Sequence, residues 1–207
     1  MKSLNKVINN SQRLTFTFTK YLEKERQFIE TTIEKYLESI GMAEISNRLC
    51  YCLHEQASNA CKANSKRVYF IEQKLDITKP NDYVFGISKF KECIIRKRDY
   101  YFALREKKKL YIKFQIKRDS EYLYISIINN VPLTPEESEK IKEKFDLSDK
   151  YDNMVDAIDD LTDVQEGAGL GIFTIIMMFK EMGINKECLK IFNTPTETHA
   201  TTKIHYM

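Results

Sequence analysis

The chain has 207 residues, of which 43% are hydrophobic and 30% are charged, and its formal net charge is +3. These proportions are typical of a globular protein and exclude a wholly disordered chain. No apolar run approaches the roughly 20 residues that cross a bilayer, and the first residues lack the apolar core of a secretory signal. We therefore expect one cytoplasmic domain, 1–207, and no membrane partner.

The first third of the chain predicts a strand followed by two helices. Apolar and polar residues alternate over 13–18, which indicates a half-buried strand. Apolar residues recur at helical spacing over 20–40 and again over 44–63, and Asn64 suits the end of the second helix. The stretch RVYFIEQ, 67–73, is rich in β-branched and aromatic residues, so we expect a strand there.

Residues 76–108 form a basic insertion in this pattern. The stretch FKECIIRKRDYYFALREKKK predicts a partly amphipathic helix rich in Lys and Arg. These cations suit a protein partner or the acidic segment that follows later, and nucleic acid is the less favoured alternative. Two strands follow within 110–129, joined by a tight turn at Asp119 and Ser120.

The last third predicts two helices and two strands. Thr134 suits the N-cap of the first helix. The acidic stretch 146–165 is long for a connector, so we expect a mobile functional loop. An apolar helix over 172–182 and strands at 188–193 and 200–206 close the chain. This order predicts an α+β fold: a two-layer sandwich whose mixed, mostly antiparallel sheet has helices on one face.

The second helix carries the sequence HEQASNACKAN at 54–64. A helix advances about 100° per residue, so Glu55, Asn59 and Lys62 fall within roughly 60° of one another. Such a face suits a nucleotide: Asn59 would hold Mg²⁺, Lys62 would meet phosphate, and Glu55 would orient or deprotonate the attacking group. The alternative is a solvated helix face, because this spacing is common on surface helices.

A glycine-rich segment, EGAGLGIFTI, precedes the apolar helix of the last third. Gly167, Gly169 and Gly171 allow the backbone to approach a ligand closely, and a helix N-terminus favours anions. The pattern is neither the GxGxxG dinucleotide fingerprint nor a P-loop. Glycine-rich turns also open helices for packing alone, and that alternative stays open.

Together these two segments resemble boxes of the histidine-kinase-like ATPase superfamily, which includes sensor histidine kinases, gyrase-type topoisomerases, a heat-shock chaperone and anti-sigma-factor serine kinases. The superfamily's Glu-x-x-x-Asn-Ala-x-Lys box is matched by Glu55, Asn59, Ala60 and Lys62. Its second glycine box is matched by Gly167, Gly169, Leu170 and Gly171. The acidic stretch lies where the superfamily has its ATP lid. The layout is most similar to that of the anti-sigma-factor serine kinases.

The adenine end of the resemblance is altered. The superfamily's first glycine box, Asp-x-Gly, falls at Asn129 and Val131. The resemblance implies that Asn129 meets the adenine amine without the charge of an aspartate. Val131 would strain or block the pocket if a positive φ were needed there. In the closing strand, Thr201 matches a threonine that lies near the adenine.

The resemblance implies a regulator that binds ATP with Mg²⁺ and phosphorylates or sequesters a regulatory protein partner, and a homodimer is compatible with the sequence. In such a protein Glu55 is the catalytic group, Asn59 the metal ligand and Lys62 a phosphate contact. The alternative, favoured by Asn129 and Val131, is a degenerate member that does not hydrolyse nucleotide and acts as a protein-interaction module through its basic insertion.

Overall fold

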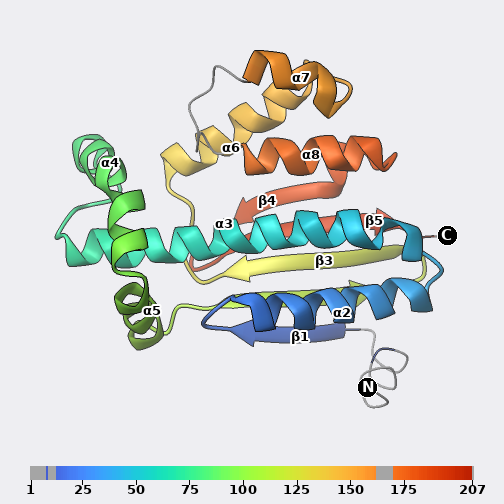
Figure 1. The fold of residues 1–207 in the computed structure, drawn as a ribbon, viewed down its shortest axis with the longest axis horizontal. Coiled ribbons are helices and arrows are strands. Elements are labelled where there is room, and N and C mark those ends of the chain that lie inside the picture. The colour runs from blue at the N-terminus through green and yellow to red at the C-terminus, as the bar shows by residue number, and fades with distance from the viewer. Residues whose placement is uncertain (1–7, 9–12, 162–169, 207) are drawn as a thin grey trace.

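The computed structural model describes residues 8, 13–161 and 170–206, with the side chains of 158–161 left out. Figure 1 shows the arrangement of its helices and strands. In chain order these are β1 (Arg13–Phe18), α2 (Glu23–Ser39), η1 (Ala43–Ile45), α3 (Ser46–Glu72), α4 (Pro80–Arg96), α5 (Arg98–Lys107), β2 (Ile112–Arg118), β3 (Tyr122–Asn129), α6 (Pro135–Ser148), α7 (Met154–Leu161), α8 (Gly171–Glu181), η2 (Lys186–Cys188), β4 (Leu189–Asn193) and β5 (Thr198–His205).

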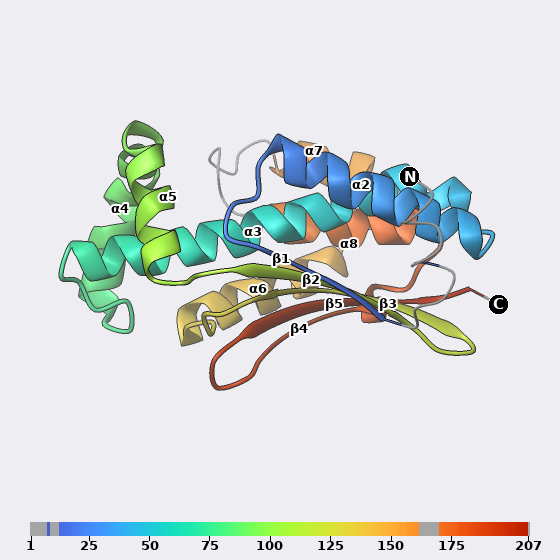
Figure 2. The ribbon, with the colours of Figure 1, turned by 90° about the horizontal axis from the view of Figure 1, so that it is seen from below.

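The described strands form one sheet in the order β1-β2-β3-β5-β4. Each neighbouring pair is antiparallel, so the expected parallel component of the sheet is not present among the described strands. Helices α2, α3 and α8 lie on one face of this sheet, and α6 packs against α8 on the β4 side (Figures 1 and 2). The predicted α+β fold with a helical layer on one face is therefore confirmed.

Helix α3 is the central element of the helical layer. It has 27 residues, which corresponds to about 40 Å. Its first half buries Leu49, Leu53 and Ala57 against the sheet, where Phe114 and Ile125 are fully buried. Its second half extends beyond the sheet and carries α4 and α5 (Figure 1). The core between α3 and the sheet thus fixes the position of the polar residues on the other sides of α3.

The strand expected at 67–73 is wrong, because α3 continues through this stretch to Glu72. Asn64 does not end the helix; its buried side chain donates to the carbonyl oxygen of Tyr111 at 3.0 Å. Tyr69 and Phe70 are buried in a second apolar cluster with residues of α4 and α5. Strand propensity was overridden here because these aromatic side chains find tertiary partners from a helix.

The basic insertion folds as two helices, α4 and α5, rather than one. Together with the end of α3 they form a region that we call the insertion lobe, residues 67–110 (Figure 1). Gly86 of α4 lies against Phe70, and a Cβ at residue 86 would lie 2.5 Å from Phe70 Cζ. Arg105 of α5 is 2% exposed and donates to Thr19 O, Ser65 Oγ and Cys61 O at 3.2 to 3.4 Å. These contacts fix the lobe to α3 and to the end of β1.

The acidic stretch 146–165 is partly helical, which the sequence did not predict. Helix α7 lies within it, and Ala157 is buried against Phe173 and Met177 of α8. The predicted cap of α6 is confirmed, since Thr134 Oγ1 accepts a hydrogen bond from the backbone N–H of Glu137 at 3.2 Å. None of the helices in the described ranges is long and apolar enough to cross a membrane.

Candidate functional site

The middle of α3 lies against the first turn of α8. A Cβ added to Gly171 would lie 2.2 Å from Glu55 Oε1 and 2.9 Å from Glu55 Cδ. One turn earlier in α3, Cys52 Sγ lies 4.0 Å from Met178 Sδ of α8. An alanine at residue 171 would therefore require the Glu55 side chain to move. The structure thus brings together Glu55 and Gly171, which are far apart in the sequence.

Glu55, Asn59 and Lys62 lie together on one face of α3, as their spacing predicts. Lys62 Nζ lies 3.8 Å from Glu55 Oε1 and 3.5 Å from Asn59 Oδ1. The Lys62 side chain is 61% exposed, so this ion pair is weak and the ammonium is free to change partners. Asn59 Oδ1 is an amide oxygen, and such an oxygen can be a ligand of Mg²⁺ when phosphate oxygens supply further ligands. No cluster of three or more His, Cys, Asp or Glu side chains that could hold a metal occurs within the described residues.

The N-terminus of α8 faces this group. Leu170 occupies the N-cap position, and its side chain accepts no hydrogen bond from the first turn. A first turn that its own N-cap side chain does not cap presents backbone N–H groups and a partial positive charge, which favours a carboxylate or a phosphate. Glu55 is the carboxylate that lies there. The matching residues Gly167 and Gly169 lie outside the described residues.

Asn129 ends β3 and is engaged inside the protein. It is 3% exposed, and its amide Nδ2 donates to Asn64 Oδ1 at 3.3 Å and to the carbonyl oxygen of Val131 at 3.4 Å. Asn64 follows Glu55 by nine residues, which corresponds to roughly 13 Å along the axis of α3. Asn129, which contacts Asn64, therefore lies beside a different part of α3 from Glu55. An aspartate at 129 would lack both hydrogen-bond donors, which explains why an amide suits this position.

Val131 is not strained in the way that the resemblance suggested. Among the described residues, positive φ angles occur at Gly41, Lys74, Lys109 and Gly183, and Val131 is not one of them. Its side chain is buried, and its carbonyl oxygen accepts a hydrogen bond from Thr198 Oγ1 at 2.7 Å. A β-branched residue is therefore acceptable here.

Thr201 does not lie with the other candidate residues. Its hydroxyl pairs with Ser126 Oγ at 2.9 Å on the face of the sheet that points away from the helices. The threonine on the helix side is Thr202, which is fully buried and lies 3.4 Å from Gln56 Nε2 of α3. Successive strand residues point to opposite faces, so a shift of one position moves the matched side chain to the wrong side of the sheet.

A hollow of about 330 Å³ lies on the other flank of Glu55. It is lined by Tyr21, Arg26, Tyr51, His54, Glu55, Ser58 and Cys61. The hydroxyl of Tyr21 lies 2.5 Å from His54 Nδ1. Burial lowers the pKa of His54 and raises that of Tyr21, so both are neutral at pH 7. Sequence patterns do not predict this pair, because Tyr21 lies outside the helix that carries His54.

A buried ion cluster clamps the start of α6 to α3. Glu137 Oε1 lies 2.7 Å from Lys66 Nζ, and Glu137 Oε2 lies 2.6 Å from Arg67 Nη2. Burial alone would raise the pKa of Glu137, but the hydrogen bonds from Arg67 and the charge of Lys66 outweigh it and lower the pKa to about 2. Thr134 and Glu137 have the spacing of a capping box, which is visible in the sequence. The pairing of Glu137 with Arg67 was not predicted, because a strand was expected at 67–73.

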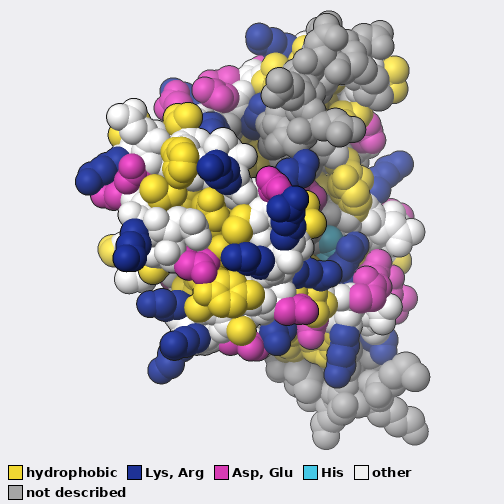
Figure 3. Space-filling model, turned by 60° about the vertical axis from the view of Figure 1, so that its left-hand side comes forward, with side chains coloured by type: hydrophobic (Ala, Val, Ile, Leu, Met, Phe, Trp, Pro, Cys, Tyr) yellow, Lys and Arg dark blue, Asp and Glu magenta, His cyan; other side chains and the backbone are white. Residues whose placement is uncertain are grey.

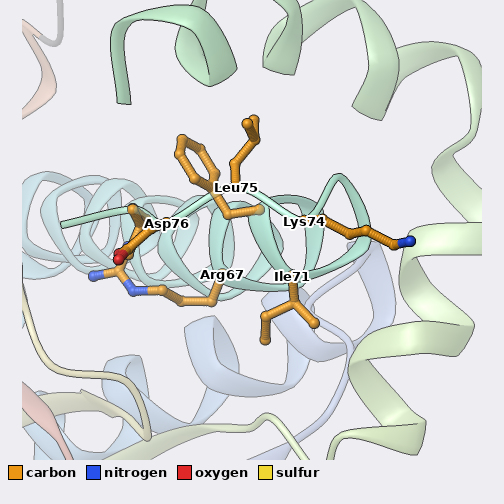
Figure 4. A pocket seen from close by; sticks show the side chains of 7 residues that line it. Arg67, Ile71, Lys74, Leu75 and Asp76 are labelled. Atoms are coloured by element: carbon orange, nitrogen blue, oxygen red, sulfur yellow. The ribbon is translucent and has the colours of Figure 1, made fainter. Parts of the chain in front are cut away.

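A second hollow, of about 470 Å³, lies at the end of α3 (Figure 4). Its lining is Arg67, Phe70, Ile71, Lys74, Leu75, Asp76 and Ile77. The insertion lobe also exposes large apolar side chains, namely Ile71, Val84, Phe85, Ile95 and Tyr100. Figure 3 shows this side of the molecule, where hydrophobic side chains lie among lysines and arginines. The lobe therefore presents a mixed apolar and basic surface.

Comparison with known proteins gives a relative but no activity. No family model and no solved structure matches the chain. The chain is 34% identical over 164 residues to a protein of Treponema pallidum (strain Nichols) described as an uncharacterized protein. The matched residues make up 79% of this chain and 32% of the relative, so the chain spans about a third of the relative's length. The resemblance to the ATPase superfamily stays a prediction.

Proposed function

We propose that the chain is a histidine-kinase-like ATPase domain that binds ATP with Mg²⁺ between α3 and α8 and uses the nucleotide to regulate a protein partner in the cytoplasm. The observation that carries this proposal is the contact between Glu55 and Gly171. It gives the polar face of α3 and the N-terminus of α8 a common location, and both are chemically suited to a triphosphate.

The phosphate end of this site fits the proposed ligand. The first-turn N–H groups of α8 and the exposed ammonium of Lys62 are suited to phosphate oxygens, and Asn59 is suited to Mg²⁺. Bound Mg²⁺ would supply neutralisation of phosphate charge. Lys62 would then exchange Glu55 for phosphate, which would leave the Glu55 carboxylate available to orient or deprotonate an attacking group.

The base end fits less closely. Asn129 already uses its amide donors within the protein, and Thr201 points away from the helical layer. Thr202 lies on the helix side of β5, but it is fully buried against Gln56. Weak selectivity for the base is the expected consequence, so GTP should bind nearly as well as ATP.

Thermal-shift titration with Mg·ATP, Mg·ADP and Mg·GTP tests the proposal. A ligand at a hundred times its dissociation constant stabilises the folded state by about 2.7 kcal/mol, which such a titration detects. Asn59→Ala should remove the Mg²⁺ dependence of the shift. Asn47→Ala is the matched control, because it removes an exposed amide from the same helix. If no nucleotide shifts the melting temperature of the wild-type chain, the proposal is wrong.

A second candidate function is a protein-interaction module that does not use nucleotide. The exposed apolar residues and the hollow on the insertion lobe favour it. In that case the Glu55, Asn59 and Lys62 face would be a solvated surface, and variants there would leave both stability and partner binding unchanged. An absent nucleotide shift, together with a partner whose affinity falls when Val84 and Ile95 are changed to serine, would establish this alternative.

A further inference from the structure

The face of the sheet opposite the helices carries cations and aromatic rings. Since side chains alternate along each strand, the residues that do not contact the helical layer all point to this outer face. Its cations are Arg13, Lys113, Lys117, Lys190 and Lys203. Its rings are Tyr122, Tyr124, Phe192, His199 and His205. Figure 2 shows helices α2, α3 and α8 on the other side of the sheet.

The strand register makes these residues one continuous surface. Tyr124 pairs with Lys117 on one side and with Lys203 on the other. Further along β3, Ile128 pairs with His199, which in turn pairs with Phe192. Four residues of β3 separate the two rows, which corresponds to about 13 Å. Two aromatic platforms therefore lie on the same sheet face, each within reach of lysine side chains.

The described strands contribute cations but no carboxylates to this face. Within the described strands, no Asp or Glu occupies an outer-face position. The acidic residues near it come from the turns: Asp119 of the β2–β3 turn is hydrogen-bonded to Tyr124. Glu197 of the β4–β5 turn lies 3.2 Å from Lys113 Nζ and 3.1 Å from His199 Nε2. A basic face with an acidic margin at its ends attracts an anionic ligand along its centre.

Phe192 is exposed, whereas Tyr122 and Tyr124 are partly buried and have lysine side chains beside their rings. Lys203 Nζ lies 3.6 Å from the centroid of the Tyr122 ring and 5.8 Å from that of Tyr124. Phe192 is 47% exposed, and its ring stacks on His199 with centroids 5.1 Å apart and an interplanar angle of 14°. An exposed cation–π contact is weak, so a base can replace the ammonium on the ring while the lysine turns to a phosphate.

We propose that the outer face of the sheet binds single-stranded nucleic acid, with bases on Tyr122, Tyr124 and Phe192 and phosphates on Lys117 and Lys203. Alternating rings and cations on an open sheet match this ligand, because each nucleotide brings a planar base and one negative charge. In a duplex the base faces are stacked on one another and cannot stack on these rings, and an acidic peptide would contact the lysines without needing the rings. This inference is independent of the proposed nucleotide site, which lies on the other side of the sheet.

Fluorescence anisotropy with labelled single strands of about ten nucleotides tests the proposal. Tyr124→Leu, which keeps an apolar side chain suited to a strand, should weaken binding about 10-fold. The double variant Lys117→Ala/Lys203→Ala should weaken binding and reduce the slope of log affinity against log salt by about 0.7 for each lost contact. The matched control is Lys89→Ala/Lys91→Ala, which removes two exposed lysines from the insertion lobe and should leave affinity unchanged. Circular dichroism checks that each variant is folded.

Several outcomes would contradict the proposal. Equal affinity for polyglutamate, with no effect of Tyr124→Leu, would indicate an acidic protein and overturn the proposal. Loss of binding only in the Lys89/Lys91 variant would move the site to the insertion lobe. A change of molecular mass in solution in the sheet variants would indicate that a second copy of the chain covers the face. No binding of any single strand to the wild-type protein would also overturn it.

Discussion

Glu55 of α3 occupies the space that a side chain at residue 171 would need, because its Oε1 lies 2.2 Å from the position of a Cβ on Gly171. The contact joins the helix that carries the amide and ammonium groups to the helix whose N-terminus faces them. It is also the feature of the candidate site that mutation tests most directly.

Gly171→Ala should displace the Glu55 carboxylate and lower the free energy of unfolding by about 1 to 2 kcal/mol. In the Glu55→Ala background the same change should be neutral or stabilising, because alanine is preferred over glycine in a helix by about 1 kcal/mol. Urea unfolding of the four proteins in a double-mutant cycle measures the coupling. Additivity within about 0.5 kcal/mol would show that the two residues do not interact.

Asn129→Asp should destabilise the fold, although it restores the aspartate of the ATPase superfamily. The new carboxylate would be 3% exposed, beside Asn64 Oδ1 and the carbonyl oxygen of Val131, and would donate to neither. We expect a loss of about 2 to 4 kcal/mol at pH 7, measured by chemical denaturation. Asn81→Asp, at an exposed position in the first turn of α4, is the control and should be nearly neutral.

The Glu137 cluster should make stability depend on acid pH. The pKa of Glu137 is lowered to about 2 from 4.5, so its contribution is fully present above pH 4.5. It is lost progressively as the pH falls from 4.5 towards 2, and it amounts to about 3 kcal/mol. Glu137→Gln should be less stable at pH 7 and should lack this part of the acid transition. Glu139→Gln, which removes an exposed carboxylate, should retain the wild-type pH profile.

Arg105 should contribute far more to stability than Arg98, although both guanidinium groups lie over the ring of Phe102, at 4.7 and 5.2 Å. Arg105 is buried and donates to Thr19 O, Ser65 Oγ and Cys61 O, so Arg105→Ala should cost about 2 to 4 kcal/mol. Arg98→Ala, at an exposed position, should stay within about 0.5 kcal/mol of wild type. Equal effects in thermal unfolding would show that the insertion lobe is not anchored by Arg105.

Local patterns were sufficient for several elements. The alternation in β1, the β2–β3 hairpin and the Thr134 cap of α6 follow from interactions between residues close in sequence, and the structure contains each of them. The spacing of Glu55, Asn59 and Lys62 likewise fixed their common face, because helix geometry is the same wherever the helix packs.

Long-range contacts decided the rest. The stretch 67–73 has the residues of a strand, yet it is helical because Tyr69 and Phe70 pack against α4 and α5. Thr201 and Thr202 are neighbours of one residue type, and only the register of β5 determines which of them faces the helices. Propensity describes the preference of a short segment, and these outcomes depend on partners that the segment does not contain.

The sequence by itself determined the polar face of α3, the presence of a glycine-rich segment before an apolar helix and the α+β order of the chain, since each depends on spacing along the backbone. Only the tertiary structure decided that Glu55 lies against Gly171, that Asn129 donates to Asn64, and that aromatic rings and cations lie together on the outer face of the sheet. These relationships arise when burial of the core fixes helices and strands against one another, and burial acts between residues that are distant in sequence.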